Sequence, residues 1–252
     1  FSMSAALVGA TTSRKSRPKV HLSASAYPTI AAIVLLAALL IGGQIVYGKI
    51  FAWNTMSSLL DNNAYLVILA VGMTFTILTG GIDLSVGAVL AFSSVAGVLM
   101  LQAGVPVVVV MPAIVLMGTA FGLLSGILVR YFNFKPFIAT LSTMFLARGL
   151  ASILSIEPVR VDPDSSMMAL SARIVLIDGP KRNDFYISLN ILIALAVIVA
   201  GYFLLHRTRF GRTVYALGGN AQSVELMGLP AGRSTVWVYV VSGTCAGLAG
   251  LV

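Results

Sequence analysis

The chain has 252 residues, of which 58% are hydrophobic and only 10% are charged. A water-soluble domain carries about a quarter charged residues, so an ordinary soluble enzyme or binding module is excluded. The net charge of +8 comes from 16 basic and 8 acidic residues. The positions of these basic residues decide whether they indicate nucleic-acid binding or basic cytoplasmic loops.

The N-terminal segment carries four basic residues between Arg14 and Lys19. It lacks the apolar core and the small-residue cleavage site of a secretory signal. We therefore predict that residues 1–26 form a disordered basic arm in the cytoplasm, and that a transmembrane domain occupies residues 27–252.

Apolar stretches of near-spanning length follow this arm. A transmembrane helix needs about 20 mostly apolar residues, and a last stretch begins near Thr235 and continues to Val252. We expect an all-α, polytopic membrane protein with about six to seven transmembrane helices in this fragment, truncated at its C-terminus. The stretches before the last one cover residues 27–46, 65–79, 86–101, 105–129, 136–154 and 187–205.

The charged residues test this topology, because Lys and Arg concentrate in cytoplasmic loops. With the N-terminus inside, alternation places the turn that holds Arg130 and Lys135 inside. It places residues 156–186 outside, where four basic and five acidic residues give a charge of −1. Residues 206–233, with four arginines and Glu225, are then inside. The basic excess is therefore a topology signal, and nucleic-acid binding is not expected.

A polar turn separates the second and third apolar stretches. Gly80 and Gly81 end a helix readily because glycine adopts backbone angles closed to other residues. Asp83 or Ser85 can then accept hydrogen bonds from the free amides at the start of the next helix. A break of this kind is tolerated in a membrane only where protein or a water-filled cavity surrounds it. The sequence leaves open whether the turn re-enters the membrane or joins two full spans.

Hydroxyl side chains near this turn indicate a candidate path for a solute. If the helix before it stays regular, Gly72, Thr76 and Thr79 share one face that leads to Asp83. A small, hydroxylated face of this kind can line a path for a hydroxyl-rich solute. The structural alternative is that Asp83 caps a helix while the face forms a close helix contact; the two roles can coexist.

A second polar face lies in the stretch 136–154, where Thr140 and Thr143 follow at helical spacing beside Arg148. Arg148 is as consistent with snorkelling to the interface as with facing a path. The candidate residues of the substrate path are Thr76, Thr79, Gly80, Gly81, Asp83, Ser85, Thr140 and Thr143.

The same region resembles a known family. Three segments resemble the signature of permease subunits of bacterial ABC sugar importers. They are Asn63-Ala64, Val71-Gly72-Met73-Thr74 and the block Leu78-Thr79-Gly80-Gly81-Ile82-Asp83-Leu84-Ser85-Val86-Gly87. This branch includes the ribose, xylose and galactose systems. Within this branch, the residues of these motifs look closest to one permease of the galactofuranose importer, which pairs two different permeases. The resemblance covers nearly everything from about residue 28 on, and family members have several further helices.

A second match to the family lies in residues 206–233. They predict a short helix over Arg212–Leu217, stopped by two glycines, and another over 221–227 with Val224 and Met227 on one apolar face. The residues alone allow docking on a soluble partner or anchoring at lipid headgroups. In the family this loop couples the permease to the ATP-hydrolysing subunit. The resemblance implies the coupling residues Arg209, Gly211, Arg212, Tyr215, Gly218, Gly219 and Asn220, although the pattern departs from the family's after Asn220.

The resemblance implies a permease subunit of an ATP-driven importer that forms the path for a monosaccharide across the bacterial inner membrane. The partners it implies are an ATP-binding subunit, a second permease, identical or different, a periplasmic sugar-binding protein that faces residues 156–186, and membrane lipid. The chain has no Gly-x-x-x-x-Gly-Lys-Ser/Thr phosphate loop. We therefore expect ATP and magnesium in the partner, and neither a cofactor, a metal nor an enzymatic activity in this chain.

Two other functions fit parts of the pattern. An ion-gradient-driven secondary transporter also has broken helices near the membrane middle, and transport by the lone protein without ATP would identify it. A membrane enzyme acting on lipid-linked substrates is the other, but the apolar stretches lack the His/Asp/Glu cluster that such chemistry needs.

Overall fold

The computed structural model describes residues 27–157, 159, 173–177 and 184–252. Two compact units divide the chain at residue 51. The predicted basic arm, 1–26, lies outside the described residues, as do residues 158, 160–172 and 178–183 of the predicted outer segment.

In the first unit, the described residues form the helix α1 (Tyr27–Tyr47), which matches the first predicted stretch. Its 21 residues include no charged side chain, as an apolar environment requires. The helix ends at Gly48, whose φ of +68° is open to glycine and whose amide donates to the carbonyl of Gln44 at 2.9 Å.

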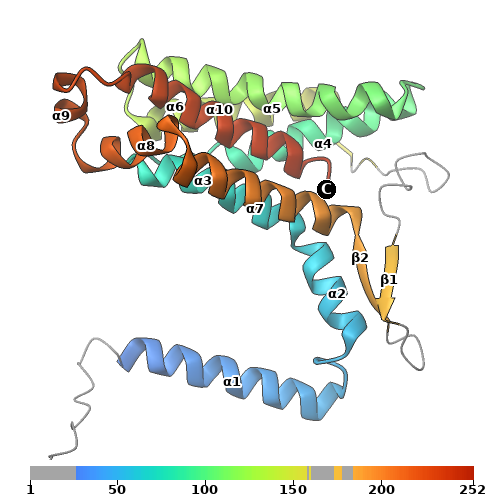
Figure 1. Cartoon of the computed structure of the whole chain (residues 1–252). Coiled ribbons are helices and arrows are strands. Elements are labelled where there is room, and N and C mark those ends of the chain that lie inside the picture. Colours follow the sequence, from blue (N-terminus) through green and yellow to red (C-terminus); the bar gives the residue numbers. More distant parts are fainter. Residues whose placement is uncertain (1–26, 158, 160–172, 178–183) are drawn as a thin grey trace, which may run out of the picture. The chain divides into compact units, whose positions relative to one another are not determined.

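The second unit is a helical bundle with one small hairpin (Figure 1). Its helices are α2 (Trp53–Asn62), α3 (Ala64–Leu78), α4 (Val86–Gln102), α5 (Val107–Arg130), α6 (Pro136–Leu154), α7 (Leu189–Arg207), α8 (Arg209–Gly219), α9 (Ala221–Leu226) and α10 (Ala231–Ala249). The strands β1 (Arg173–Ile177) and β2 (Phe185–Ser188) pair antiparallel, with Val175 opposite Tyr186. The all-α class is confirmed, and the hairpin is an addition that the sequence did not predict.

Among the described residues, fewer helices are long and apolar enough to cross a membrane than the six to seven expected. Four described helices are long and apolar enough to cross a membrane: α1 from Pro28, α5, α6 and α7. A fifth span arises if α2 and α3, bent by 46°, count as one. α4 has 17 residues, and α10 contains Arg233 in its first turn.

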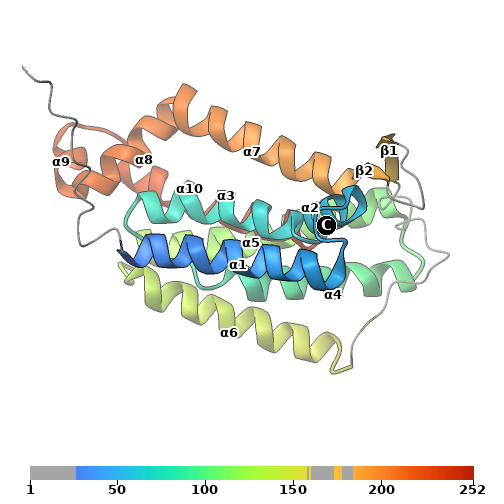
Figure 2. The same cartoon turned by 90° about the horizontal axis from the view of Figure 1, so that it is seen from below.

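The helices α3 to α7 and α10 of the second unit alternate in direction, as Figures 1 and 2 show. The α3–α4 turn, the α5–α6 turn and the pair α8–α9 gather at one end of the bundle. Side chains confirm this grouping, because Arg130 at the end of α5 contacts Glu225 in α9, and Thr140 in α6 contacts the carbonyl of Ile82. The Gly80–Ser85 turn therefore joins two helices that run in opposite directions.

Helix α10 packs against α5 with their backbones in direct contact. A Cβ atom added to Gly118 would lie 2.4 Å from the carbonyl oxygen of Gly243, and one added to Gly122 would lie 2.3 Å from that of Tyr239. Glycines four residues apart let two membrane helices approach this closely. This contact fixes α10 in the bundle, where it also lies against α3 and α4.

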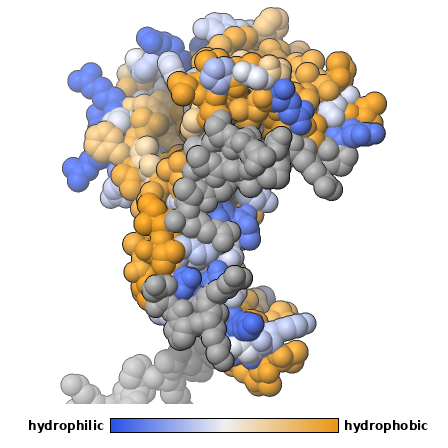
Figure 3. Space-filling model, turned by 90° about the vertical axis from the view of Figure 1, so that its right-hand side faces the viewer, coloured by the Kyte–Doolittle hydropathy of each residue, from blue (hydrophilic) through white to orange (hydrophobic). Residues whose placement is uncertain are grey.

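The surface of this unit is largely apolar. In Figure 3 hydrophobic residues cover much of the visible surface of the bundle in its upper part. Exposed leucine, isoleucine, valine and phenylalanine side chains lie on α3, α5, α6 and α7. Such continuous apolar exposure indicates a surface that faces lipid or another membrane subunit.

Candidate functional site

Asp83 is buried in the α3–α4 turn, with 2% of its surface exposed. Its Oδ1 accepts hydrogen bonds from the Ser85 amide at 2.9 Å and from Ser85 Oγ at 2.6 Å. Its Oδ2 accepts from Ser242 Oγ, in the middle of α10, at 2.7 Å. Because both carboxylate oxygens are bonded, Asp83 holds the turn in shape and ties it to α10.

The two glycines before Asp83 each meet a different requirement. Gly80 has a φ of +76°, a conformation that side chains disfavour. At Gly81 a Cβ atom would lie 2.7 Å from the hydroxyl oxygen of Tyr239, and the Gly81 amide donates to the carbonyl of Thr76 at 2.9 Å. The helix break at Gly80 and Gly81 is confirmed.

The predicted face of α3 is mainly a helix contact. The position of Gly72 leaves no room for a side chain, since a Cβ atom there would lie 2.7 Å from that of Cys245 in α10. Thr76 is fully buried, and its Oγ1 donates to the carbonyl of Met73 at 2.8 Å. Thr79, at the helix end and only partly buried, donates in the same way to Thr76 at 2.8 Å. Gly72 and Thr76 therefore fit the structural alternative, in which this face of α3 forms a close helix contact.

The predicted face of α6 is also engaged inside the bundle. Thr140 Oγ1 lies 2.9 Å from the carbonyl oxygen of Pro136 and 3.2 Å from that of Ile82 in the α3–α4 turn. Thr143 accepts from Ser125 Oγ of α5 at 2.9 Å. Arg148 is exposed. Seven of the eight candidate path residues therefore lie in the α3–α4 turn or beside it, whereas Thr143 contacts α5. A role in passing a solute stays a prediction.

The loop after α7 begins with α8, which starts three residues earlier and ends two residues later than predicted. Thr208 caps it by accepting from the Gly211 amide at 3.1 Å. The prediction that Gly218 and Gly219 stop the helix is wrong, because both are its last residues. Gly218 is required by close packing instead, since a Cβ atom there would clash with the carbonyl oxygen of Leu78.

Six of the seven predicted coupling residues divide into two kinds. Arg209, Arg212 and Tyr215 are exposed on α8. The others shape the loop: Gly211 packs against the carbonyl of Leu205, and Asn220 caps α9. Gly219 has open space where a Cβ atom would be. The Asn220 cap is confirmed, with its Oδ1 accepting from the Ser223 amide at 3.0 Å.

Helix α9 presents a different apolar surface from the one predicted. Val224 is 1% exposed and packs with Leu217 and Ala231, so it is not available to a partner. Leu226 is 87% exposed and Met227 is 65% exposed. The prediction that Val224 and Met227 form one face is wrong, because α9 ends at Leu226 and the chain turns at Met227.

Two features of the site were missed at the sequence level. Ser242 completes the bonding of Asp83, but nothing in the sequence links two residues so far apart. The glycines Gly118, Gly122, Gly243 and Gly247 stand in two Gly-x-x-x-Gly patterns, a spacing that predicts close helix contact. That signal was present and would have paired α5 with α10.

Comparisons with known proteins place these features in context. Residues 55–252 match the family described as the branched-chain amino acid transport system permease component. A fructose import permease of Bifidobacterium longum is 48% identical over 246 residues, which are 96% of this chain and 72% of that protein. An inner membrane ABC transporter permease of Escherichia coli K12 is 42% identical over 203 residues, 79% of this chain and 59% of that protein.

The motif residues looked closest to those of a galactofuranose importer permease. The galactofuranose transporter permease of Escherichia coli K12 is 32% identical over 211 residues. The match covers 81% of this chain and 57% of that protein. The chain thus spans 57–72% of the length of these three relatives. No solved structure matches the chain.

Proposed function

Since this chain belongs to the branched-chain amino acid transport system permease family, in the branch of ABC sugar importer permeases, we propose that it is a transmembrane permease subunit that forms the path for a monosaccharide. The observation that carries this proposal is the 48% identity to a fructose import permease over 96% of the chain. A ketohexose is accordingly the first sugar to test. These relatives favour an ATP-driven importer over an ion-gradient-driven carrier.

The second part of the proposal concerns coupling to an ATP-binding subunit, which supplies ATP and magnesium. Helix α9 supports it, because Leu226 and Met227 extend from the bundle without covering apolar neighbours. An exposed apolar pair at the end of a short helix suits insertion into a groove of a soluble protein. Arg212 and Tyr215 of α8 are also exposed on the same loop, and they extend the proposed docking surface.

The third part is the orientation in the bacterial inner membrane. The end of the bundle that holds Arg130, Lys135 and the α8–α9 loop carries most of its basic residues, which favours the cytoplasm. The opposite end, with α2 and β2, then faces the periplasm and a sugar-binding protein (Figure 1). The N-terminus is cytoplasmic in this orientation, and a second permease, identical or different, completes the path.

Uptake in proteoliposomes tests the proposal. The full-length permease is reconstituted with the ATP-binding subunit, the second permease and the sugar-binding protein, and uptake of labelled fructose, ribose and galactose is measured. We expect uptake of one of these sugars only with ATP inside and the binding protein outside. Uptake by the permease alone under an ion gradient, without ATP, would contradict it.

A further inference from the structure

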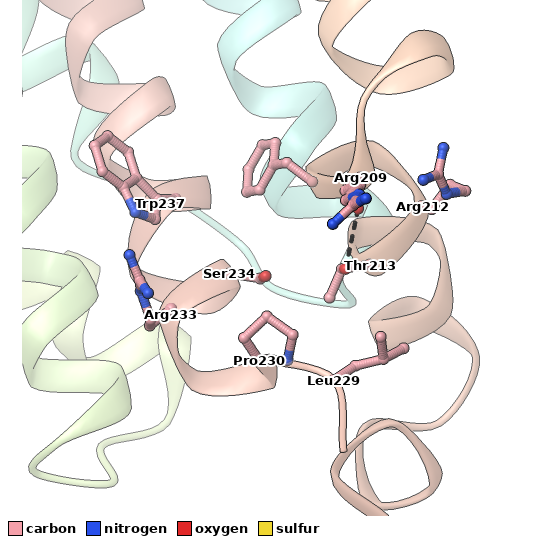
Figure 4. A pocket seen from close by; sticks show the side chains of 9 residues that line it. Arg209, Arg212, Thr213, Leu229, Pro230, Arg233, Ser234 and Trp237 are labelled. Carbon is pink, nitrogen blue, oxygen red and sulfur yellow. Dashed lines mark hydrogen bonds between the residues drawn. The ribbon is translucent and has the colours of Figure 1, made fainter. Parts of the chain in front are cut away.

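A groove of about 630 Å³ lies between the start of α8 and the first turns of α10 (Figure 4). Its two walls are at least 16 residues apart in sequence and meet at the end of the bundle that carries the α8–α9 loop. The residues that line it are Arg209, Phe210, Arg212, Thr213, Leu229, Pro230, Arg233, Ser234 and Trp237.

The groove is lined by positively charged side chains and by no acidic side chain that would neutralise them. Three of its lining residues are arginines and none is acidic. Among the residues that the structure describes, none of these arginines forms an ion pair, whereas nearby Arg130 pairs with Glu225 at 3.3 Å. Guanidinium groups donate in a planar fork that matches the oxygens of phosphate. The groove is therefore suited to an anion with several oxygens.

One buried hydroxyl in the groove has no hydrogen-bond partner among the described residues. Ser234 is 5% exposed, and its side chain forms no hydrogen bond with any described residue. Figure 4 shows its oxygen directed into the space between α8 and α10. The other hydroxyl, that of Thr213, donates to the carbonyl of Arg209 at 3.1 Å. Buried polar groups are nearly always bonded, so the Ser234 hydroxyl indicates a ligand oxygen in this space.

The rest of the groove is apolar, and one of its residues is typical of a membrane interface. Trp237 follows Arg233 by one turn of α10 and is 53% exposed. Tryptophan is enriched where the hydrocarbon meets the headgroups, and Phe210 and Leu229 add apolar surface beside it. A ligand that fills this groove therefore has an anionic head at the arginines and an apolar part against Trp237.

We propose that this groove binds the headgroup of an anionic phospholipid, with phosphatidylglycerol as the simplest example. Arg209 and Arg233 hold the phosphate from either side, Ser234 donates to one of its oxygens, and the acyl chain follows Trp237 along α10. Basic pockets between membrane helices recognise anionic headgroups in this way. Arg212 points away from Ser234 in Figure 4, so it stays free for the ATP-binding subunit. The site goes beyond sugar transport and does not depend on which sugar is carried.

The experiment is lipid counting by native mass spectrometry on the full-length permease purified from membranes. Wild type is titrated with phosphatidylglycerol and, separately, with phosphatidylcholine of the same acyl chains. Arg209→Ala and Arg233→Ala should each weaken phosphatidylglycerol binding by roughly tenfold, since bonds to charged groups are the strong ones. Ser234→Ala should weaken it by about threefold, and none of the three should change phosphatidylcholine binding.

Arg207→Ala is the matched control, because it removes the same charge from the end of α7 without touching the groove. It should leave phosphatidylglycerol binding unchanged. An equal loss in this variant, or an unchanged preference for phosphatidylglycerol when Arg209 and Arg233 are both alanine, would overturn the site. If both arginine variants fail to fold, the Ser234→Ala result decides.

Two further arms identify the source of the anion. Inorganic phosphate at a concentration equal to the dissociation constant of the lipid should not displace the lipid. Displacement would mean that the site binds a free anion. Addition of the ATP-binding subunit should leave the lipid bound, and its release would assign the groove to an acidic segment of that subunit. Sugar uptake enters neither arm, so this proposal and the transport function fail separately.

Discussion

The turn around Asp83 and the α8–α9 loop belong to the same family resemblance, yet their polar residues are placed in opposite ways. Around Asp83 the carboxylate, Ser85 and Ser242 are buried and bonded to one another. On α8 and α9 the residues Arg212, Tyr215 and Leu226 are exposed. A motif match alone does not separate residues that build the bundle from residues that meet a partner; burial and bonding do.

This difference leads to a rule for the effects of mutation. Changes in the buried turn or in the α5–α10 contact should lower the free energy of unfolding, because they break packing or leave buried groups unbonded. Changes on the exposed faces of α8 and α9 should leave stability intact and alter association. Each variant below is chosen to fall clearly on one side.

The largest effect is expected for Gly122→Leu. Its side chain would meet the carbonyl of Tyr239 across the α5–α10 contact, where even a Cβ atom lies at 2.3 Å. The loss of stability should exceed about 3 kcal/mol, the upper end of the range typical of overpacked cores. Gly149→Leu is the control, since nothing lies within 4 Å of its added Cβ. Thermal unfolding in detergent measures both, and equal melting temperatures would contradict the contact.

Asp83→Ala should come next. It leaves the hydroxyls of Ser85 and Ser242 buried without their acceptor, and the expected cost is about 3 kcal/mol for the lost charge-assisted bonds. Ser242→Ala removes one of these bonds and should cost about 1 kcal/mol. The same thermal measurement ranks the two variants; a smaller loss for Asp83→Ala than for Ser242→Ala would refute the bonding scheme.

Asp83→Asn separates the structural role from the transport role. It keeps the shape of the side chain and one acceptor oxygen, so stability should fall by less than in Asp83→Ala. Sugar uptake and melting temperature are measured on the same preparation. Lower uptake at unchanged stability would favour contact with the solute, whereas unchanged uptake with a lower melting temperature would leave Asp83 with its structural role alone.

The double change Leu226→Ser with Met227→Ser should act on association only. Both side chains are exposed, so stability should stay within about 0.5 kcal/mol. Affinity for the ATP-binding subunit should fall by roughly tenfold or more, as expected when apolar anchors are lost. Val224→Ala is the counterpart on the buried side of α9 and should lower stability. Co-purification of the ATP-binding subunit reads the difference, and full recovery with the double variant would exclude these anchors.

The smallest effect is expected for Arg130→Ala. Its ion pair with Glu225 joins α5 to α9, but the two side chains are 44% and 55% exposed. Exposed pairs contribute about 0–1 kcal/mol, so the melting temperature should hardly change. Faster hydrogen exchange in α9 alone would show that the pair holds this helix in place; a change beyond α9 would show a larger role than the exposure allows.

The apolar stretches predicted most of the helices within a few residues, because spanning length and hydropathy are strong signals. The Asn220 cap and the Gly80–Gly81 break could be predicted for a different reason, since each depends on local backbone chemistry. The polar sequence from Trp53 to Asn62 gave no apolar signal, so α2 was missed.

What could not be predicted depends on contacts between distant segments. Gly218 ends no helix because α8 continues across it while packing on the end of α3. Ser242 bonds Asp83 from 159 residues away. Val224 and Met227 share a spacing that fits one face, but the chain turns at Met227 and only tertiary packing decides which of them is covered.

Cysteine labelling tests the central claim, that the α8–α9 loop faces the cytoplasm, most directly. Leu226→Cys and Ile156→Cys are a matched pair, 87% and 94% exposed at opposite ends of the bundle, and the native Cys245 is buried. A membrane-impermeant maleimide applied to the periplasmic side of intact cells should label Ile156→Cys and leave Leu226→Cys unreacted, with the reverse pattern in inside-out vesicles. Labelling of Leu226→Cys from the periplasmic side would contradict both the orientation and its coupling to an ATP-binding subunit.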